Sequence, residues 1–449
     1  MRKNLIIAVL IFSAAIIIFG GCSDRGYKKP TAPTYGTEWG LWPDISAAFR
    51  TSSGSATAPA QLLFQIRNPE SILKLEVYVP KEAWPAPEGG GQRVPLLVLL
   101  APEGGDRYFY SDRGLYELAD EMVAKGEIQP MIIVTVANDP TFNGYFYGNS
   151  YPAGLYDGII ADTVDYWDTD FGDYTKRGLI GWLYMNEIGE LLVDSPDKRG
   201  IAGVGQGAYG AFRAILKHPG VYNSISVADG PLSFNDGLTN LFAQAEAEQR
   251  ANWATIPDAG DFNANFTIND FDTSYTMPIS DMFVGGSLAF SPWVYELFYQ
   301  FDNQTRPTVG DPAIVDSAYG YDLGPESLNT ALIGIPSGDW DFYLPFSVQN
   351  GTFVKNDNVW ALWEDNDLPT MLDANPTALD QVSIFVATSA QAHWGYHDMT
   401  NAWISKLGTN VDEVYQYQGY GGNPATDNQY MYDLMKRWLK FHSDNFETN

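Results

Sequence analysis

The fold of this chain is decided by the stretch Gly200-Ile201-Ala202-Gly203-Val204-Gly205-Gln206-Gly207-Ala208-Tyr209-Gly210-Ala211. It begins with a short apolar run, and the residues from Gln206 onward have helical spacing, so it predicts a strand that turns sharply into a helix. Gly203 and Gly207 flank the turn and let it pack closely, while Gly205 at its tip relieves the backbone strain of a sharp turn. The stretch is typical of a strand–turn–helix unit in an α/β protein.

Similar strand and helix patterns alternate along most of the chain. We predict strands over 62–66, 73–79, 95–100, 130–136, 200–204, 225–228, 382–388 and 411–417, and helices over 112–125, 179–192, 206–218, 397–407 and 427–441. Runs such as 97–100 are apolar without interruption, which fits strands that are buried on both faces of a sheet. The alternation predicts a mostly parallel central sheet with helices on both faces.

The alternation stops between residues 235 and 356. This segment is dense in Asp, Asn, Phe, Tyr and Trp and is too aromatic for a disordered region. So long an insertion in a compact domain is usually functional, so we expect a lid or a binding element. Its acidic and amide side chains suggest oxygen ligands for Ca²⁺, but they lack the spacing of an EF-hand loop, which favours a hydrated loop. The residues concerned are Asp258, Asp261, Asn263, Asn265, Asn269, Asp270 and Asp272.

The segment 1–22 has the pattern of a secretion signal. Arg2 and Lys3 precede an apolar run over 5–19 and then Gly20-Gly21-Cys22, which is typical of a bacterial lipoprotein signal with lipidation at Cys22. An ordinary cleaved signal peptide and an uncleaved anchor helix are the alternatives, although the run is short for a membrane span. Residues 23–61 are rich in Pro, Gly, Ser and Thr and predict a flexible tether, which leaves 62–449 as the folded domain.

The signal pattern predicts an extracytoplasmic protein that is anchored by lipid to a bacterial membrane, and Ser23 favours the outer membrane or the cell surface. With 26 basic and 55 acidic residues the formal net charge is −29, which disfavours nucleic acid and anionic membrane surfaces as partners. Contact with a membrane is therefore expected only through the anchor. Cys22 is the sole cysteine, so no disulfide or thiol chemistry is available. We expect no metal ion and no cofactor.

Four segments carry a resemblance to a known family. They are Leu99-Leu100 with Gly104-Gly105-Asp106, then 199–211 with Lys217-His218-Pro219, then Leu288-Ala289-Phe290-Ser291-Pro292, and finally 363–376. With the closing strand and helix they span about residues 70–442. The chain thereby resembles the bacterial esterase family of α/β-hydrolases that includes esterase D and feruloyl esterase relatives. The resemblance implies an α/β-hydrolase fold in which the insertion 235–356 comes after the strand that follows the elbow.

The resemblance also implies a Ser–Asp–His triad, and this chain departs from it at each position. The nucleophile, at the tip of a G-x-S-x-G elbow, falls on Gly205, the acid falls on Gln391 and the histidine falls on Asn423. Glycine offers no nucleophile, and an amide cannot take up a proton near neutral pH. In the loop Ala101-Pro102-Glu103 the proline has no N–H for an oxyanion, and the carboxylate repels one. We therefore expect a protein that has lost ester hydrolysis and binds a ligand or a partner.

Two alternatives stay open. The first is a working carboxylic ester hydrolase with a non-standard site on His393, His397 and Asp398, which follow the strand that delivers the triad acid in relatives. The two histidines are also spaced as metal ligands on one helix face, but a third ligand is not evident. The second is a structural protein of the cell surface. Simpler interpretations hold for the remaining candidates: His218 ends a helix, His442 is solvated near the terminus, Ser195 and Ser389 are surface or turn serines, and Asp229 lies in a turn.

A retired catalytic cleft can still bind a small molecule. We expect its lining to include Glu103, Gln206, Tyr209, Trp394, Tyr396 and Tyr420, with Trp293, Tyr295 and Phe298 contributed by the insertion. Aromatic faces beside the amides of Gln391 and Asn423 suit a sugar, a phenolic ring or an ester. An envelope protein is the alternative partner. Taken singly, Tyr209 and Trp293 are also explained as core residues.

Overall fold

The structure is a computed structural model, and it describes residues 45–51, 73–83, 92–138, 144, 146–150, 154–155, 160, 179–180, 183, 187–266, 271, 278–290, 293–295, 332–334, 340–418 and 427–448. The predicted signal segment with Cys22, the predicted strand 62–66, and residues Phe298, Tyr420 and Asn423 lie outside these ranges. Within them, none of the helices is both long enough and apolar enough to cross a membrane.

The centre of the fold is an eight-stranded sheet with the strand order β1-β2-β4-β3-β7-β8-β14-β15. The strands are β1 (Ile45–Thr51), β2 (Leu73–Val79), β3 (Leu96–Leu100), β4 (Ile132–Val136), β7 (Arg199–Val204), β8 (Ser224–Ala228), β14 (Ser383–Ser389) and β15 (Glu413–Tyr417). Within this sheet β2 and β4 pair antiparallel, and the other neighbouring strands pair parallel. The central strand β3 is buried along its whole length, as its uninterrupted apolar run predicts.

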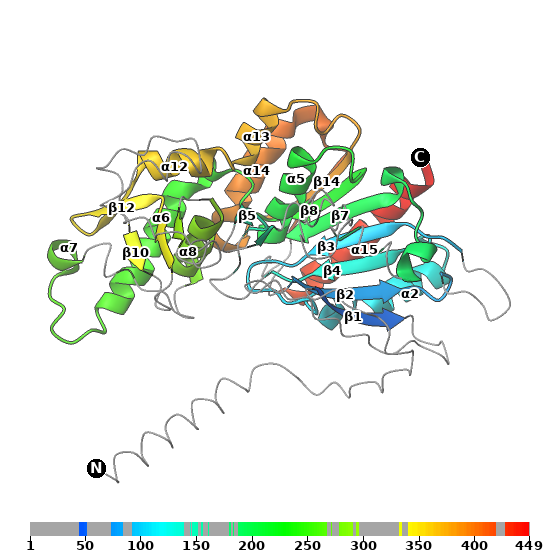
Figure 1. The fold of residues 1–449 in the computed structure, drawn as a ribbon, viewed down its shortest axis with the longest axis horizontal. Helices are drawn as coiled ribbons and strands as arrows, with labels where there is room; N and C mark the ends of the chain where they lie inside the picture. Colours follow the sequence, from blue (N-terminus) through cyan, green and yellow to red (C-terminus); the bar gives the residue numbers. More distant parts are fainter. Residues whose placement is uncertain are drawn as a thin grey trace, which may run out of the picture.

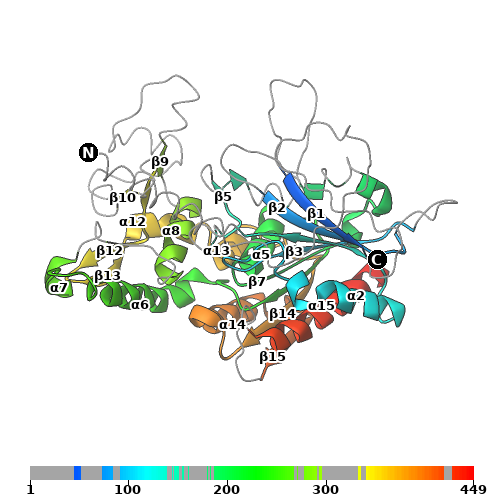
Figure 2. The same cartoon turned by 90° about the horizontal axis from the view of Figure 1, so that it is seen from below.

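Helices cover both faces of the sheet (Figures 1 and 2). Because side chains alternate along a strand, Val98 of β3 packs in one core with α5 (Gln206–Lys217) and α14 (Tyr396–Leu407). Its neighbour Leu97 packs in a second core with α2 (Leu115–Ala124) and α15 (Asn428–Thr448). This mostly parallel sheet, covered on both faces and carrying a strand–helix elbow at β7 and α5, is an α/β-hydrolase fold. The predicted fold class is confirmed.

The insertion leaves the sheet after β8. Its helices are α6 (Phe234–Trp253), α7 (Phe262–Asn265) and α8 (Pro278–Phe290), and α12 (Asp357–Glu364) and α13 (Leu368–Ala374) then lead back to β14. Its strands are β9 (Trp293–Tyr295), β10 (Leu332–Gly334), β11 (Trp340–Tyr343), β12 (Phe346–Gln349) and β13 (Thr352–Lys355). A small pair, β5 (Asn149–Ser150) and β6 (Gly154–Leu155), lies between β4 and β7 in the sequence. In both views α6, α8 and α12 lie to one side of the main sheet (Figures 1 and 2).

The insertion is more regular than its sequence indicates. We predicted no helix there, yet α6 runs for 20 residues. A carboxylate far away in the sequence satisfies its first turn, since Asp367 Oδ1 accepts a hydrogen bond of 2.6 Å from the N–H of Phe234. Its inner face buries Phe242, whose ring contacts Phe283 and Phe346 at centroid distances of 5.4 and 5.2 Å. Capping and packing from distant residues therefore stabilise a helix that local spacing does not reveal.

An aromatic cluster joins the insertion to the elbow helix. The ring of Tyr209 on α5 stacks on Phe234 at 5.3 Å and meets the edge of Phe146 at 5.6 Å. Trp363 of α12 and Phe290 of α8 close the cluster, with their centroids 5.3 Å apart. Because these five rings are buried against one another, the base of the insertion belongs to the core and not to a loosely attached lid.

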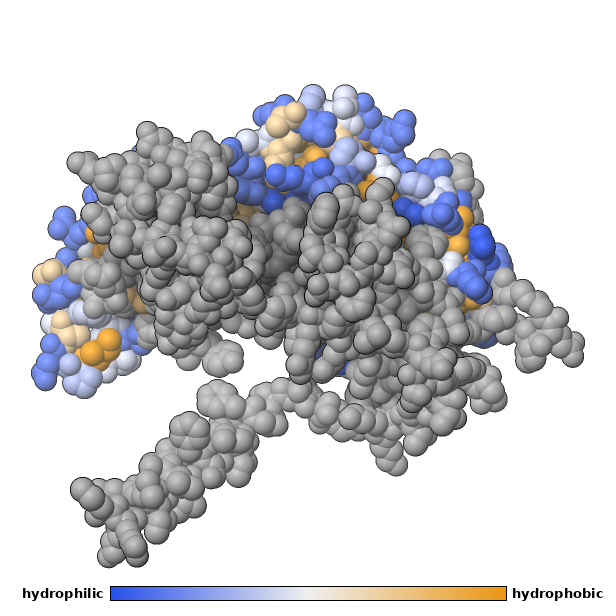
Figure 3. Space-filling model, viewed as in Figure 1, coloured by the Kyte–Doolittle hydropathy of each residue, from blue (hydrophilic) through white to orange (hydrophobic). Residues whose placement is uncertain are grey.

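Three predicted boundaries differ from the structure. β1 lies inside the segment 23–61 that we predicted as a tether, because it pairs with β2 in parallel register from Ile45 opposite Leu73 to Thr51 opposite Val79. The last helix, α15, continues to Thr448, seven residues past its predicted end at 441. In the predicted helix 179–192, residues 179, 180 and 183 are helical and Glu187–Leu191 forms a short 3-10 helix, while 181–182 and 184–186 lie outside the described ranges. On the face shown in Figure 3, hydrophilic residues predominate among the coloured residues, as the net charge of −29 leads one to expect.

Candidate functional site: the elbow and the groove beside it

The elbow has the backbone geometry of a nucleophile turn. Gly205 lies between β7 and α5 with φ 58° and ψ −126°, a backbone conformation that residues other than glycine rarely adopt. The flanking glycines are needed for close packing: a Cβ on Gly203 would lie 2.3 Å from the backbone of Gly207, and a Cβ on Gly207 would lie 2.2 Å from the carbonyl oxygen of Leu100. The strand, the turn and the helix are those of a hydrolase elbow, and the residue at its tip carries no side chain.

The carboxylate of Glu103 fills the space where that side chain would be. A Cβ built on Gly205 would lie 2.2 Å from Oε2 of Glu103. The same oxygen accepts a hydrogen bond of 2.9 Å from the backbone N–H of Gln206. In serine hydrolases of this fold, the N–H of the residue after the nucleophile stabilises the oxyanion. Here that donor is already bonded to an acidic side chain of the same chain.

The carboxyl group of Glu103 lies in a weakly hydrated position. Burial raises its pKa to about 7, although hydrogen bonds from the backbone N–H groups of Gln206 and of Glu103 itself act in the opposite direction. Burial, and then the charge of Glu103, raise the pKa of the Tyr396 hydroxyl. Glu103, Gly205 and Gln206, which the sequence predicts at one cleft, are therefore in contact.

Two of the residues predicted to bind a ligand point into the core. The side chain of Gln206 is fully buried, and its Oε1 accepts hydrogen bonds from Nδ2 of Asn138 at 3.0 Å and from the N–H of Phe146 at 3.1 Å. The hydroxyl of Tyr209 donates to the carbonyl oxygen of Asn366 at 2.6 Å. Both side chains hold loops and helices in place, and Tyr396 is likewise buried, with 1% exposure. None of the three faces a solvent-filled cleft, in contrast to the sequence-based expectation.

Asp229, which we predicted to be a turn residue, is a buried acid beside the elbow. Asp229 directly follows β8 with φ 39° and 1% exposure, and its backbone carbonyl accepts the N–H of Gly205 at 3.0 Å. Its carboxylate accepts hydrogen bonds of 2.9 Å from the N–H of Ser389 and 2.9 Å from the hydroxyl of Tyr430. Burial raises the pKa of Asp229 to about 7. Its place at the carboxyl end of a strand next to the elbow is the signal that could have identified it.

Ser389 is also not the surface or turn residue that we expected. It ends β14 with 1% exposure, and its backbone N–H is the one that Asp229 binds. Gln391, on which the family's acid falls, is exposed in the turn after β14, and its N–H donates to Oγ of Ser389 at 3.2 Å. The buried acid at this end of the strands therefore follows β8, which is the neighbour of β14 in the sheet.

The ring of His397 is bound to neutral groups on both sides. Its Nε2 lies 3.0 Å from Nδ2 of Asn401, and its Nδ1 lies 3.0 Å from Oγ1 of Thr388. The Thr388 hydroxyl in turn hydrogen-bonds Asp229. Asp398, the third member of the fallback site, is exposed on α14. The structure assigns His397 to a hydrogen-bond chain at the edge of the sheet.

His442 is a core residue and not the solvated one that the sequence suggests. It has 0% exposure, and its ring nitrogens lie 2.7 Å from Oγ of Ser224 and 2.8 Å from Oγ of Ser226. Burial lowers its pKa to about 3. The prediction failed because α15 continues past this residue and packs it against β8, where the hydroxyls satisfy both nitrogens.

The remaining predicted residues lie apart from the elbow. Trp394 is half-buried in the short 3-10 turn His393–Gly395, with its ring in edge contact with Tyr396 at 5.8 Å. Trp293 and Tyr295 belong to β9, His218 follows α5, and Ser195 precedes the 3-10 turn Pro196–Lys198. Asp261 accepts the N–H of Asn263 at the start of α7. No group of three or more His, Cys, Asp or Glu in the described ranges is placed to hold a metal ion.

Comparison with known proteins gives distant likenesses only. No family model matches the chain, and no curated protein matches it. Among solved structures, a ferulic acid esterase is 15% identical with a TM-score of 0.42, over 82% of this chain and 91% of that one. A substrate-bound fluorophosphonate-binding serine hydrolase of Staphylococcus aureus is 12% identical with a TM-score of 0.42, over 87% and 95%. An S-formylglutathione hydrolase of the same organism is 12% identical with a TM-score of 0.39, over 82% and 92%. The sheet topology, and not these likenesses, defines the fold.

Proposed function

We propose that this chain is an esterase-like protein that no longer hydrolyses esters and acts by binding at the bacterial cell envelope. One observation carries the proposal: Glu103 is bonded to the N–H of Gln206 directly beside the side-chain-free tip at Gly205. An ester carbonyl in this place would meet no nucleophile. Glu103 already accepts the N–H that would stabilise the oxyanion of ester hydrolysis, and in its ionised form its charge would oppose that oxyanion.

The other positions of the expected triad support the same proposal. Gln391 and Asn423 carry amides, which neither shuttle a proton nor orient a proton shuttle as a carboxylate does. The acid beside the elbow, Asp229, is bonded to Ser389 and Tyr430, and the ring of His397 is bonded to Thr388 and Asn401. These groups form a satisfied internal network, and loss of a triad alone lowers turnover by about a millionfold in a well-studied protease.

The place of action follows from the first 22 residues. Their lipoprotein pattern, with Cys22 as the lipidated residue, supports an extracytoplasmic protein that is tethered to a membrane and faces the outer membrane or the cell surface. The acidic composition keeps such a protein soluble and away from nucleic acid and anionic lipid surfaces. Its partner is then a small molecule of the envelope or an envelope protein.

The test is an assay for hydrolysis with the purified full chain. With p-nitrophenyl acetate and a methyl feruloyl ester as substrates, we expect the same rate as in buffer alone. Gly205→Ser, alone or with Glu103→Ala, is expected to remain inactive, because positions 391 and 423 still carry amides. Turnover well above buffer that disappears in His397→Ala would overturn the proposal and establish an esterase with a non-standard site.

A further inference from the structure

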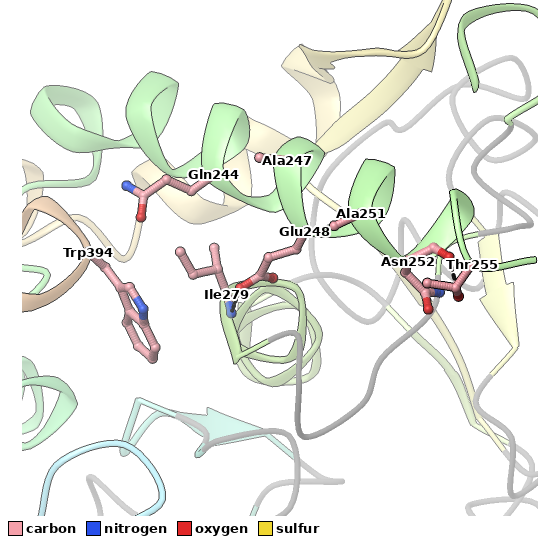
Figure 4. Close-up of a pocket in the computed structure, with 8 residues that line it drawn as sticks. All are labelled: Gln244, Ala247, Glu248, Ala251, Asn252, Thr255, Ile279 and Trp394. Atoms are coloured by element: carbon pink, nitrogen blue, oxygen red, sulfur yellow. Dashed lines mark hydrogen bonds between the residues drawn. The ribbon is translucent and has the colours of Figure 1, made fainter. Parts of the chain in front are cut away.

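A groove lies between helices α6 and α8 of the insertion and the turn after β14. It has a volume of about 620 Å³, and most of its lining comes from α6, which supplies Gln244, Ala247, Glu248, Ala251 and Asn252, while Thr255 lies in the turn after this helix. Ile279 of α8 and Trp394 complete it. Figure 4 shows Trp394 at one end, Ile279 and Glu248 in the middle, and Asn252 with Thr255 at the other end. The groove contains neither Gly205 nor Glu103, so it is a site separate from the elbow.

The lining residues of α6 form one continuous face. They recur at intervals of three and four residues, which places them above one another along the helix. From Gln244 to Asn252 the face extends for about 12 Å at 1.5 Å per residue, and Thr255 continues it past the end of the helix. Ala247 and Ala251 are exposed and add little bulk, so the floor between the polar side chains is low and flat. This shape suits an extended ligand more than a single compact ring.

Trp394 is held at the end of the groove by an unusual backbone. Its φ of 52° and ψ of 24° place a bulky residue in the left-handed region, and Gly395 follows with φ 77°. Backbone of this kind persists where the surrounding structure imposes it and is often associated with a function. Its indole is half-buried and braced by the edge of Tyr396. The turn therefore presents an apolar aromatic ring at the end of a polar groove.

Glu248 is a fixed hydrogen-bond acceptor in the middle of the groove. Its Oε1 accepts the N–H of Ile279 at 3.1 Å, and its Oε2 accepts the N–H and the hydroxyl of Ser280 at 2.8 and 2.9 Å. These bonds tie the carboxylate to the first turn of α8 and fix its orientation. Because a carboxylate oxygen can accept two hydrogen bonds, Oε1 retains capacity for a ligand hydroxyl without losing this support.

We propose that this groove binds a neutral oligosaccharide, with a sugar ring stacked on Trp394 and hydroxyls bonded to Glu248 and the amides of α6. A ring face of C–H groups matches the indole, and a row of hydroxyls matches side chains that both donate and accept. Glu248 and the net charge of −29 disfavour an anionic ligand. A lone phenolic ring would leave most of the groove unused. The inference does not depend on whether the elbow hydrolyses esters.

The test is calorimetric titration of the purified full chain with hexasaccharides of xylose, glucose (β-1,4), mannose and N-acetylglucosamine. Calorimetry is preferred because 13 tryptophans obscure a change in the fluorescence of one. We expect at least one hexasaccharide to bind. Trp394→Asn is expected to weaken this binding at least tenfold, since asparagine tolerates the left-handed backbone but removes the ring. Gln244→Ala is expected to weaken it at least threefold.

The matched control is Tyr432→Ala, which removes an exposed aromatic ring from α15 on the opposite face of the sheet and leaves binding unchanged. An unaltered thermal midpoint of Trp394→Asn shows that lost binding is not lost folding. The proposal is overturned if no hexasaccharide binds, if Trp394→Asn binds as the parent does, or if hexagalacturonate binds more tightly than every neutral sugar. Because these readings involve no turnover, they are independent of the hydrolysis assay.

Discussion

The carboxylate of Glu103 and the backbone nitrogen of Gln206 lie 2.9 Å apart, and the same carboxylate occupies the space beside Gly205 that a side chain would enter. The absence of a side chain at position 205 and the presence of this acid are therefore linked by geometry. A side chain at position 205 would displace the carboxylate of Glu103. Without Glu103, the backbone N–H of Gln206 would lose its hydrogen-bond acceptor. The carboxylate of Glu103 thus occupies the space at the tip of the elbow where a side chain of residue 205 would lie.

A double-mutant cycle tests this link. Gly205→Ala adds a methyl group 2.2 Å from Oε2 of Glu103, at a φ of 58° that is strained for alanine. We expect it to lower the free energy of unfolding by about 1–3 kcal/mol. Glu103→Ala removes the clash but leaves the strain, so the double variant should lose less than the sum of the two, by about 0.5–3 kcal/mol. Urea unfolding of the four proteins measures the coupling.

The control for that cycle pairs Gly205→Ala with Glu117→Ala, an exposed acid on α2. Those two changes should add within about 0.5 kcal/mol because the residues share no contact. Simple additivity for Gly205 and Glu103 as well would mean that the carboxylate does not occupy the tip of the elbow in solution.

Most of the central fold could be read from local patterns. The strand at 73–79 and the helix beginning at Gln206 match β2 and α5, because a buried strand or helix imprints its apolar spacing on the sequence. The position of Gly205 at the tip of the elbow followed from the same stretch. Glu103 was predicted beside it, but its hydrogen bond to Gln206 depends on how two separate loops meet, which spacing does not encode.

The rest depended on contacts between distant residues. Asp229 looks like a turn residue until Ser389 and Tyr430 are seen to bind it, 160 and 201 positions later in the chain. The helix α6 receives its first-turn acceptor from Asp367, which is 133 positions away from Phe234. Such long-range hydrogen bonds cannot be predicted from the local sequence, because the residues around each partner are equally compatible with a solvated loop.

The raised pKa of Asp229 predicts how its contribution to stability depends on pH. Its pKa of about 7 in the folded chain exceeds the ordinary value of 3.8, so the folded state holds the proton more tightly between these values. The free energy of unfolding contributed by Asp229 therefore falls as the pH rises through 7. Comparing the parent with Asp229→Asn, we expect the parent's advantage to shrink by about 1–3 kcal/mol between pH 5 and pH 8.

Urea unfolding at several pH values measures that difference directly. Glu103 and Asp367, whose pKa values burial also raises to about 7, are present in both proteins, so their contributions cancel. Asp380→Asn, on the exposed surface after α13, controls for the loss of one charge. A parent-to-variant difference that grows with pH, or stays constant, would contradict the buried and poorly hydrated position of Asp229.

His442 gives the opposite dependence on pH. Its pKa of about 3 in the folded chain lies below the ordinary value of 6.5, so the unfolded state binds more protons in between, and the stability that His442 contributes is lost as the pH falls through this window. His442→Leu fills similar space but leaves the hydroxyls of Ser224 and Ser226 without their partner. We expect a cost of about 2–4 kcal/mol at pH 7.5.

Two further measurements distinguish the hydrogen bonds of His442 with Ser224 and Ser226 from a role of the ring in packing alone. At pH 5 the loss of unfolding free energy caused by His442→Leu should be smaller by about 2 kcal/mol. In the parent alone, the unfolded state gains stability at this pH by protonating the imidazole, which stays neutral in the folded state. Adding Ser224→Ala and Ser226→Ala to His442→Leu should recover part of the lost stability, since an apolar trio leaves no buried hydroxyl unbonded. A cost that is the same at both pH values, with no recovery in the triple variant, would show that the ring contributes only its volume.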